Sequence, residues 1–150
     1  LSAMKVPAAA LLLARRDHLV IRAHLGVESV GASAFRVPLG ETLFGKAIVT
    51  GQPAAFTGGD EESHRGTRAL PPPFAWAGSA VAAPLHDAEA RERGEALGCL
   101  AVFRPEPAAF SSAQISILQA LADELVIAFQ MAQTRQALAW RLWRNTDPGA

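Results

Sequence analysis

The chain has 150 residues, half of them hydrophobic and 19% charged, which is enough for one domain with a sizeable core and excludes a mainly disordered chain. Fourteen basic residues balance fourteen acidic ones, and this argues against direct binding of nucleic acid or of an acidic membrane surface by overall charge. No apolar run reaches the ~20 residues needed to cross a bilayer, so the composition indicates a cytoplasmic domain without a membrane partner.

The first predicted elements form a hairpin over residues 8–25. An apolar run at 8–14 is followed by the turn-like sequence Arg-Arg-Asp. After it, hydrophobic residues alternate with others from His18 to Leu25, a period of two that is typical of a half-buried strand. The stretch at residues 34–40 is predicted to contain a short extended segment before Pro38.

A short helix is predicted for Glu41–Thr50, with Leu43, Phe44, Ala47 and Ile48 on one face. Gly51 suits its C-terminal cap, and Pro53 prevents its continuation. A brief strand at 54–56 follows. The next segment, Thr57–Ala77, is a long irregular loop, and such loops in a small domain are often functional.

The second half of the chain predicts another hairpin and a long helix. "GSAVAAPLH" and "EALGCLAVF" are predicted strands on either side of a polar connection. Ser111 and Gln114 then match a capping box, flanked by the apolar staple residues Phe110 and Ile115, and a helix runs from there to about Trp143. Hairpins without alternating strand–helix units favour an α+β fold, with helices packed on an antiparallel sheet.

Four stretches, taken in order, resemble the GAF domain family of sensory modules. They are "VPLGETLFGKAIVTGQPAAF", "GSAVAAPLH", "ALGCLAVF" and "FSSAQISILQALADELVIAFQMAQ", within residues 8 to about 133. The resemblance implies a GAF/PAS-like central antiparallel sheet of five or six strands, a long C-terminal helix and a pocket roofed by the irregular middle loop. The family's opening helix has only Leu1–Pro7 available here, so the chain is expected to be a fragment of a longer protein.

The stretch "GETLFGKA" comes close to a phosphate-binding loop, since Gly40, Gly45 and Lys46 fall in register. However, Ala47 stands where the motif needs a Mg²⁺-binding hydroxyl, and Glu41 would place a negative charge beside phosphate. Structural glycines in a short helix are therefore the preferred interpretation.

A ligand pocket is predicted beneath the loop. Its proposed lining consists of the aromatic residues Phe56, Phe74 and Trp76 and the polar residues Arg36, His64 and Ser79. The alternative is that the aromatic side chains only hold the loop against the sheet. His64 has acidic neighbours at 60–62, but a solvated charge run is the more common explanation, and no metal site is predicted.

The long helix carries a heptad pattern that predicts a partner-facing seam and a parallel homodimer. The seam residues singled out are Leu118, Leu125, Ala132, Ala139 and Leu142. The predicted division is a GAF-like domain at 1–133 and a helix extension with a disordered tail at 134–150. The alternative is that residues 133–143 fold back on the same domain.

The sequence shows no catalytic constellation, and its single cysteine, Cys99, lies in a predicted core strand. The resemblance therefore favours a non-catalytic domain of a signalling or transcription-control protein, one that senses a small molecule, dimerises and relays the ligand state through its last helix. The alternatives are a ligand-free dimerisation module and a sensor that carries haem or a metal. The identity of any cofactor stays open.

Overall fold

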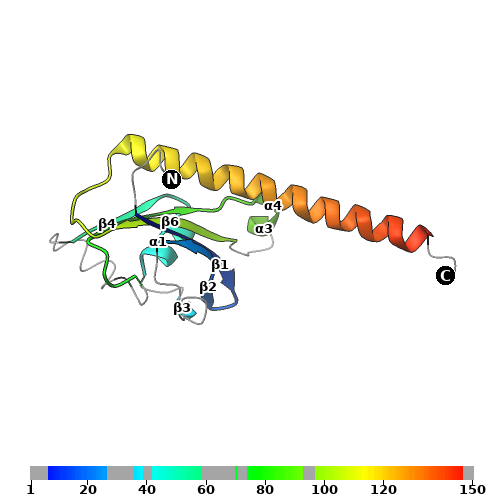
Figure 1. Cartoon of the computed structure of the whole chain (residues 1–150), viewed down its shortest axis with the longest axis horizontal. Helices are drawn as coiled ribbons and strands as arrows, with labels where there is room; N and C mark the ends of the chain where they lie inside the picture. The colour runs from blue at the N-terminus through cyan, green and yellow to red at the C-terminus, as the bar shows by residue number, and fades with distance from the viewer. Residues whose placement is uncertain are drawn as a thin grey trace.

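The computed structural model describes residues 7–26, 36–38, 42–58, 70, 74–92 and 97–146. The six strands are β1 (Ala8–Arg15), β2 (His18–Leu25), β3 (Arg36–Pro38), β4 (Ala54–Thr57), β5 (Ser79–Pro84) and β6 (Gly98–Arg104). The described helices are α1 (Leu43–Thr50), α3 (Ala88–Glu92) and α4 (Ser112–Thr146). All strand pairs are antiparallel, in the order β3-β2-β1-β6-β5-β4, so the predicted α+β fold is confirmed (Figure 1).

Helix α1 begins at Leu43, two residues after the predicted start at Glu41, and it ends in the predicted glycine cap. The side chain of Thr42 accepts a hydrogen bond from the Gly45 N–H at 3.1 Å and caps the first turn. Gly51 ends the helix with a φ of 69°, and its N–H donates to the Ala47 carbonyl at 3.0 Å. Phe44 and Ala47 are completely buried, so the predicted apolar face of α1 is confirmed.

One face of the sheet is closed by α1 and a cluster of aromatic rings. Phe74 stacks on Phe103 with ring centroids 4.5 Å apart and planes 4° apart. Phe44 meets both rings edge-on, at 5.4 and 6.2 Å. All three side chains are completely buried, so these rings fill the space that they share between α1 and the sheet.

The opposite face of the sheet is covered by α4, which packs mainly over β5 and β6. Leu118, Ala122 and Val126 face the sheet and are buried there. The helix then continues well beyond the sheet (Figure 1). It runs without interruption through residue 133, after which the helix extension was predicted to begin.

The start of α4 confirms the predicted capping box. Ser111 Oγ accepts a hydrogen bond from the Gln114 N–H at 3.1 Å, and Gln114 Oε1 accepts one from the Ser111 N–H at 2.8 Å. Phe110 is buried and Ile115 is half-buried in the same apolar cluster, as a hydrophobic staple requires. These local contacts fix where the long helix begins.

Strand β2 departs from the strict alternation that its sequence suggests. Ile21 lies opposite Leu12, and Ala23 lies opposite Leu11, so Arg22 is an extra residue in a β-bulge. The bulge reverses which face the following side chains occupy. The residues after Arg22 that were expected to continue the buried face therefore lie on the α4 face instead.

Candidate functional site

Two of the six predicted pocket residues cannot be placed in a site. His64 and its acidic neighbours lie outside the described residues, and so does the side chain of Arg36, whose backbone belongs to β3. The predicted pocket is therefore assessed on its other four residues.

Phe56 and Phe74 belong to the core between α1 and the sheet. Phe56 is buried, and Phe74 is completely buried in its stack with Phe103. Their rings are used in packing between the loop segment and the sheet. This is the arrangement expected if the aromatic side chains hold the loop in place.

Ser79 fixes the turn between β6 and α4. Its buried hydroxyl donates to the Glu106 carbonyl at 2.8 Å and accepts from Arg104 Nε at 3.0 Å. Arg104 also donates to the Ala108 carbonyl and lies over the Phe110 ring, 4.0 Å from its centroid. The Ser79 hydroxyl is therefore engaged within the protein and is not available to orient a ligand.

Trp76 is the one of these four residues with a large accessible surface. Its side chain is 43% exposed, and its ring lies 6.4 Å from that of Phe103. Trp76 thus places a reachable aromatic surface directly beside the closed core.

Gly40 and Glu41 of the near-match to a phosphate loop lie outside the described residues, and its described part, residues 42–47, lacks phosphate-binding geometry. Helix α1 begins at Leu43, before Gly45 and Lys46, whereas a phosphate loop places its glycines ahead of the helix. The Gly45 N–H is bonded to the Thr42 hydroxyl and the Lys46 N–H to the Thr42 carbonyl at 3.0 Å. These N–H groups are therefore already bonded inside the helix.

Cys99 lies in β6 and is completely buried. Burial raises the pKa of the Cys99 thiol, because desolvation disfavours the thiolate. A protonated, inaccessible thiol is a poor nucleophile. Among the described residues, no group of three or more histidine, cysteine or acidic side chains is arranged to hold a metal ion.

The structure corrects one residue of the predicted helix seam. Leu118 is completely buried against the sheet, so it belongs to the core of the domain and has no surface for a partner. Leu125 is half-buried at the side of α4. Ala132, Ala139 and Leu142 are exposed on the part of the helix that extends beyond the sheet.

A second stripe on α4, missed in the sequence, presents more apolar surface. Ile117, Ile127, Met131 and Leu138 are 42%, 56%, 53% and 52% exposed. Their spacings of ten, four and seven residues fit a heptad repeat. The predicted seam has the same heptad spacing as this second stripe. The sheet distinguishes the two stripes, because it packs against the side of α4 that carries Leu118. We call Ile117, Ile127, Met131 and Leu138 the outer stripe.

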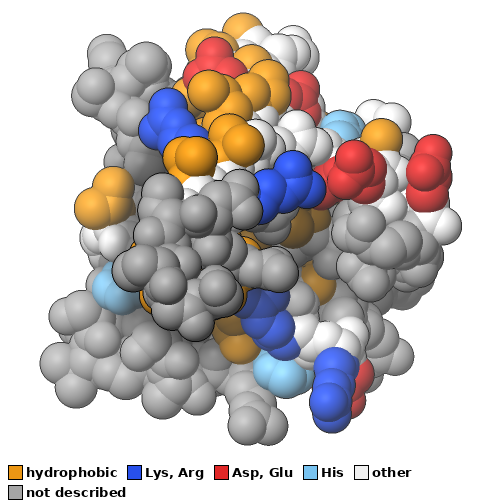
Figure 2. All heavy atoms as spheres, turned by 90° about the vertical axis from the view of Figure 1, so that its right-hand side faces the viewer, with side chains coloured by type: hydrophobic (Ala, Val, Ile, Leu, Met, Phe, Trp, Pro, Cys, Tyr) orange, Lys and Arg blue, Asp and Glu red, His pale blue; other side chains and the backbone are white. Residues whose placement is uncertain are grey.

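An apolar groove lies between α4 and the first hairpin. Its volume is about 310 Å³, and it is lined among others by Ala9, Leu11, Ala23, Leu25, Leu100 and Leu125. A view toward the C-terminal end of α4 shows hydrophobic side chains gathered over the upper side of the molecule (Figure 2). Among the described residues, most of the exposed large hydrophobic side chains belong to α4.

Helix α4 is long and apolar enough to cross a membrane, judged by length and composition alone. However, Leu118, Ala122 and Val126 pack against the sheet, and the capping box ties the start of the helix to the turn after β6. These contacts hold the first half of α4 against the sheet, while only 17% of the apolar window is buried.

The fold and its sequence now identify the family. The chain matches the GAF domain family over residues 2–129. The chain belongs to the GAF domain family. No curated protein matches it by sequence.

Solved structures with a similar fold share little sequence with this GAF domain. One is the GAF domain of a phosphoenolpyruvate-protein phosphotransferase from Acinetobacter, with a TM-score of 0.71, 21% identity and coverage of 89% of this chain and 76% of that one. Another is a domain of a proposed two-component sensor histidine kinase from Sinorhizobium meliloti, with a TM-score of 0.63, 17% identity and coverage of 92% and 88%. A third is the free methionine-R-sulfoxide reductase from Neisseria meningitidis, with a TM-score of 0.69, 21% identity and coverage of 89% and 73%. The fold therefore occurs in both regulatory proteins and enzymes.

Proposed function

We propose that this GAF domain is a non-catalytic regulatory module that pairs with a second copy through α4 and relays its conformational state along that helix. The observation that carries the proposal is the outer stripe, which continues after α4 has left the sheet. GAF domains occur in sensor and signalling proteins, and this supports a regulatory role.

The outer stripe favours a helical partner because of its length and period. Fully burying a side chain such as Ile, Leu or Met stabilises by about 1.5–3 kcal/mol relative to exposure. A heptad repeat keeps such side chains on one side of a helix, where a second helix can cover them. A copy of α4 offers the same stripe and is the simplest matching partner.

Cys99 supports a non-catalytic role. The reductase from Neisseria meningitidis shows that this fold also hosts an enzyme. In the present chain, the sole cysteine is buried and its thiol is held protonated. A thiol in that state is unsuited to attack a substrate.

Sedimentation from low to high micromolar concentration tests the pairing. Met131→Glu and Leu138→Glu should each weaken association about tenfold or more, since tenfold corresponds to about 1.4 kcal/mol. Gln133→Glu is the matched control, because two residues along a helix turn through about 200° and place the same charge on the far side. A wild-type chain that stays monomeric, or a Met131→Glu variant that pairs normally, would contradict the proposal.

Small-molecule sensing is a second candidate, favoured by the exposed ring of Trp76 beside the core. A variant with Trp140→Phe and Trp143→Phe leaves Trp76 as its only tryptophan. A ligand from a metabolite pool should then shift both the Trp76 fluorescence and the melting temperature. No shift with any pool would favour a ligand-free pairing module, and a visible absorption band after purification would indicate a cofactor.

A further inference from the structure

Two charged residues lie on the exposed apolar side of α4. Steps of alternately three and four residues from Ile117 to Arg141 trace one line of a heptad repeat, which we call the heptad line, and every residue on it is exposed. It contains the outer stripe and four further residues, Ala120, Glu124, Thr134 and Arg141. One acidic and one basic side chain therefore lie in the surface that is proposed to meet a second copy.

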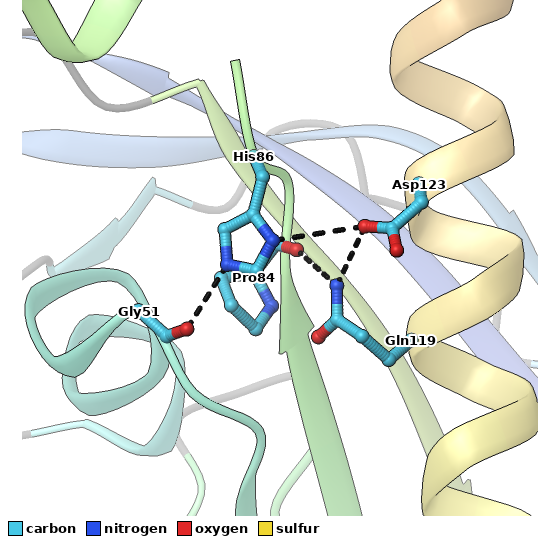
Figure 3. A network of polar contacts seen from close by, with 5 residues as sticks. All are labelled: Gly51, Pro84, His86, Gln119 and Asp123. Carbon is cyan, nitrogen blue, oxygen red and sulfur yellow. Dashed lines mark hydrogen bonds and ion pairs between the residues drawn. The ribbon is translucent and has the colours of Figure 1, made fainter. Parts of the chain in front are cut away.

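The two neighbouring acidic residues of α4 have different surroundings. Asp123 Oδ1 accepts a hydrogen bond from the Gln119 amide nitrogen at 2.9 Å, and the same nitrogen donates to the Pro84 carbonyl at 3.1 Å (Figure 3). Asp123 therefore belongs to the contacts that hold α4 to β5. Glu124 lies about 100° further around the helix. Among the described residues, neither Glu124 nor Arg141 has a side-chain hydrogen bond or ion pair, so both charges are available to a partner.

The charges of α4 are also separated along its length. From Ser112 to Thr134 the helix has two acidic residues and no basic one, and from Arg135 to Thr146 it has three arginines and no acidic residue. The helix dipole would favour acidic residues in the first turn, but the first turn of α4 has none. The helix thus has an acidic half and a basic half, which complement each other when two copies run in opposite directions.

A parallel pair would bring like charges together. In a parallel pair of helices, each residue of the heptad line faces the same residue of the second copy. Glu124 would then face Glu124, and Arg141 would face Arg141. Because like charges in contact at an interface lower the affinity, the heptad line disfavours this direction.

An antiparallel pair matches the charges and the apolar side chains in one register. Residues at equal distances from the midpoint of such a pair face each other. A midpoint between residues 132 and 133 brings together three pairs from the heptad line, which are Glu124 with Arg141, Ile127 with Leu138, and Met131 with Thr134. Two-fold symmetry repeats the Glu124–Arg141 contact about 25 Å away along the helices. Ile117 lies at the edge of this register, beside the last turn of the second copy's α4.

The second helix can reach the heptad line because that line faces away from the sheet. Met131 follows Ala122, which is buried against the sheet, by nine residues or about two and a half turns. Thr134 Oγ1 donates to the Gln130 carbonyl at 3.0 Å, so its hydroxyl needs no partner at the contact with Met131. The midpoint also lies on the part of α4 that extends beyond the sheet (Figure 1).

We propose that two copies pair with their α4 helices antiparallel, and that Glu124 and Arg141 select this direction. Desolvation offsets much of the attraction in a buried ion pair. The main effect of these two residues is therefore to disfavour the parallel direction and shifted registers. The inference rests on the proposed pairing through α4. The heptad pattern alone predicted a parallel pair, whereas the two charges favour the opposite direction.

Cysteine cross-linking determines the direction. Ile127→Cys and Leu138→Cys are made in separate chains, and the native Cys99 does not interfere because it is completely buried. Oxidation of an equilibrated mixture should give covalent dimers. Each variant alone should give few, because in an antiparallel pair its two new thiols lie about 16 Å apart along the helices. Cross-linking of each variant alone, without cross-linking between the two, would show a parallel pair and overturn the inference.

Neutral substitutions test the role of the charges by sedimentation. Glu124→Gln should weaken association about tenfold or more, because it leaves the second copy's Arg141 without its partner. Arg141→Gln should act in the same way, and the double variant should be weakened less than the two single effects combined. Glu106→Gln is the matched control, since it removes the same charge from an exposed residue ahead of α4. Stronger association of Glu124→Gln would indicate like charges in contact and overturn the inference.

The two measurements distinguish this inference from the proposed function. A dimer that cross-links as a parallel pair would support pairing through α4 and overturn only the antiparallel direction. A wild-type chain that stays monomeric at high micromolar concentration would overturn both. The substituted residues are all exposed in the single chain, so its folding should not depend on them.

Discussion

The two faces of the sheet are covered in different ways. On the α1 face, the rings of Phe44, Phe74 and Phe103 close the core from within the domain. On the α4 face, the helix covers β5 and β6, while Leu25 at the end of β2 stays 65% exposed. The contrast separates residues that stabilise the domain from residues that remain available for association.

Geometry explains why the α4 face stays partly open. A helix with its side chains is about 10–12 Å wide, and neighbouring strands lie about 4.8 Å apart. One helix therefore covers about two strands. Because α4 lies over β5 and β6, the β1–β2 hairpin retains apolar surface on that face.

The largest predicted effect tests the closed α1 face. Phe74→Ala should lower the free energy of unfolding by about 3–5 kcal/mol, because it leaves a cavity against Phe103. Trp76→Ala is the control and should cost less, since its ring is partly in water. Chemical denaturation measures both. A loss below about 1 kcal/mol for Phe74→Ala would show that this space is not packed in solution.

Adjacent residues on α4 sharpen the contrast between core and surface. Leu118→Ala should cost about 2–5 kcal/mol of monomer stability, because the side chain is completely buried. Ile117→Ala should cost less than about 1 kcal/mol in the monomer. In sedimentation the Ile117 variant should show the weaker pairing of the two, provided that both are folded. A reversal of the two stability losses would mean that α4 is rotated about its axis.

A smaller effect is predicted at the start of α4, where the capping box sets the helix on the sheet. Ser111→Ala should destabilise the domain by about 1 kcal/mol, because the Gln114 N–H loses its acceptor. Ser112→Ala, one residue later and exposed, should change stability by no more than about 0.5 kcal/mol. Thermal unfolding of the two variants measures the difference. Equal melting temperatures would contradict a capping role for Ser111.

The elements that were predicted correctly depend on short-range chemistry. The cap of α4 needs only Ser111 and Gln114, three residues apart, and the end of α1 needs only a glycine at position 51. The period of the apolar residues predicted most of the strands. The antiparallel sheet then followed from the order of the hairpins.

The features that the sequence did not reveal depend on long-range packing. The bulge at Arg22 exists because of how β2 pairs with β1, and the composition of the strand does not signal it. The heptad of α4 fits two stripes, and the sheet decides that Leu118 is buried. Phe74 is an aromatic residue of the kind that often lines a ligand pocket, but its stacking on Phe103 places it in the core.

The smallest predicted effect lies on the open part of the α4 face. Leu25→Ala should change monomer stability by about 0.5 kcal/mol or less, since its side chain already faces water. Leu13→Ala, in β1 on the same face, is the matched control and should cost about 2–5 kcal/mol because Leu13 is buried. Chemical denaturation at two protein concentrations measures both losses.

A large loss for Leu25→Ala would contradict this picture, and its concentration dependence would show the cause. If a second copy covers Leu25, the loss must grow with protein concentration, because association stabilises the folded state by mass action. A loss that does not depend on concentration would mean that the chain itself covers the groove. A negligible loss at both concentrations would leave the outer stripe as the surface to be tested for pairing.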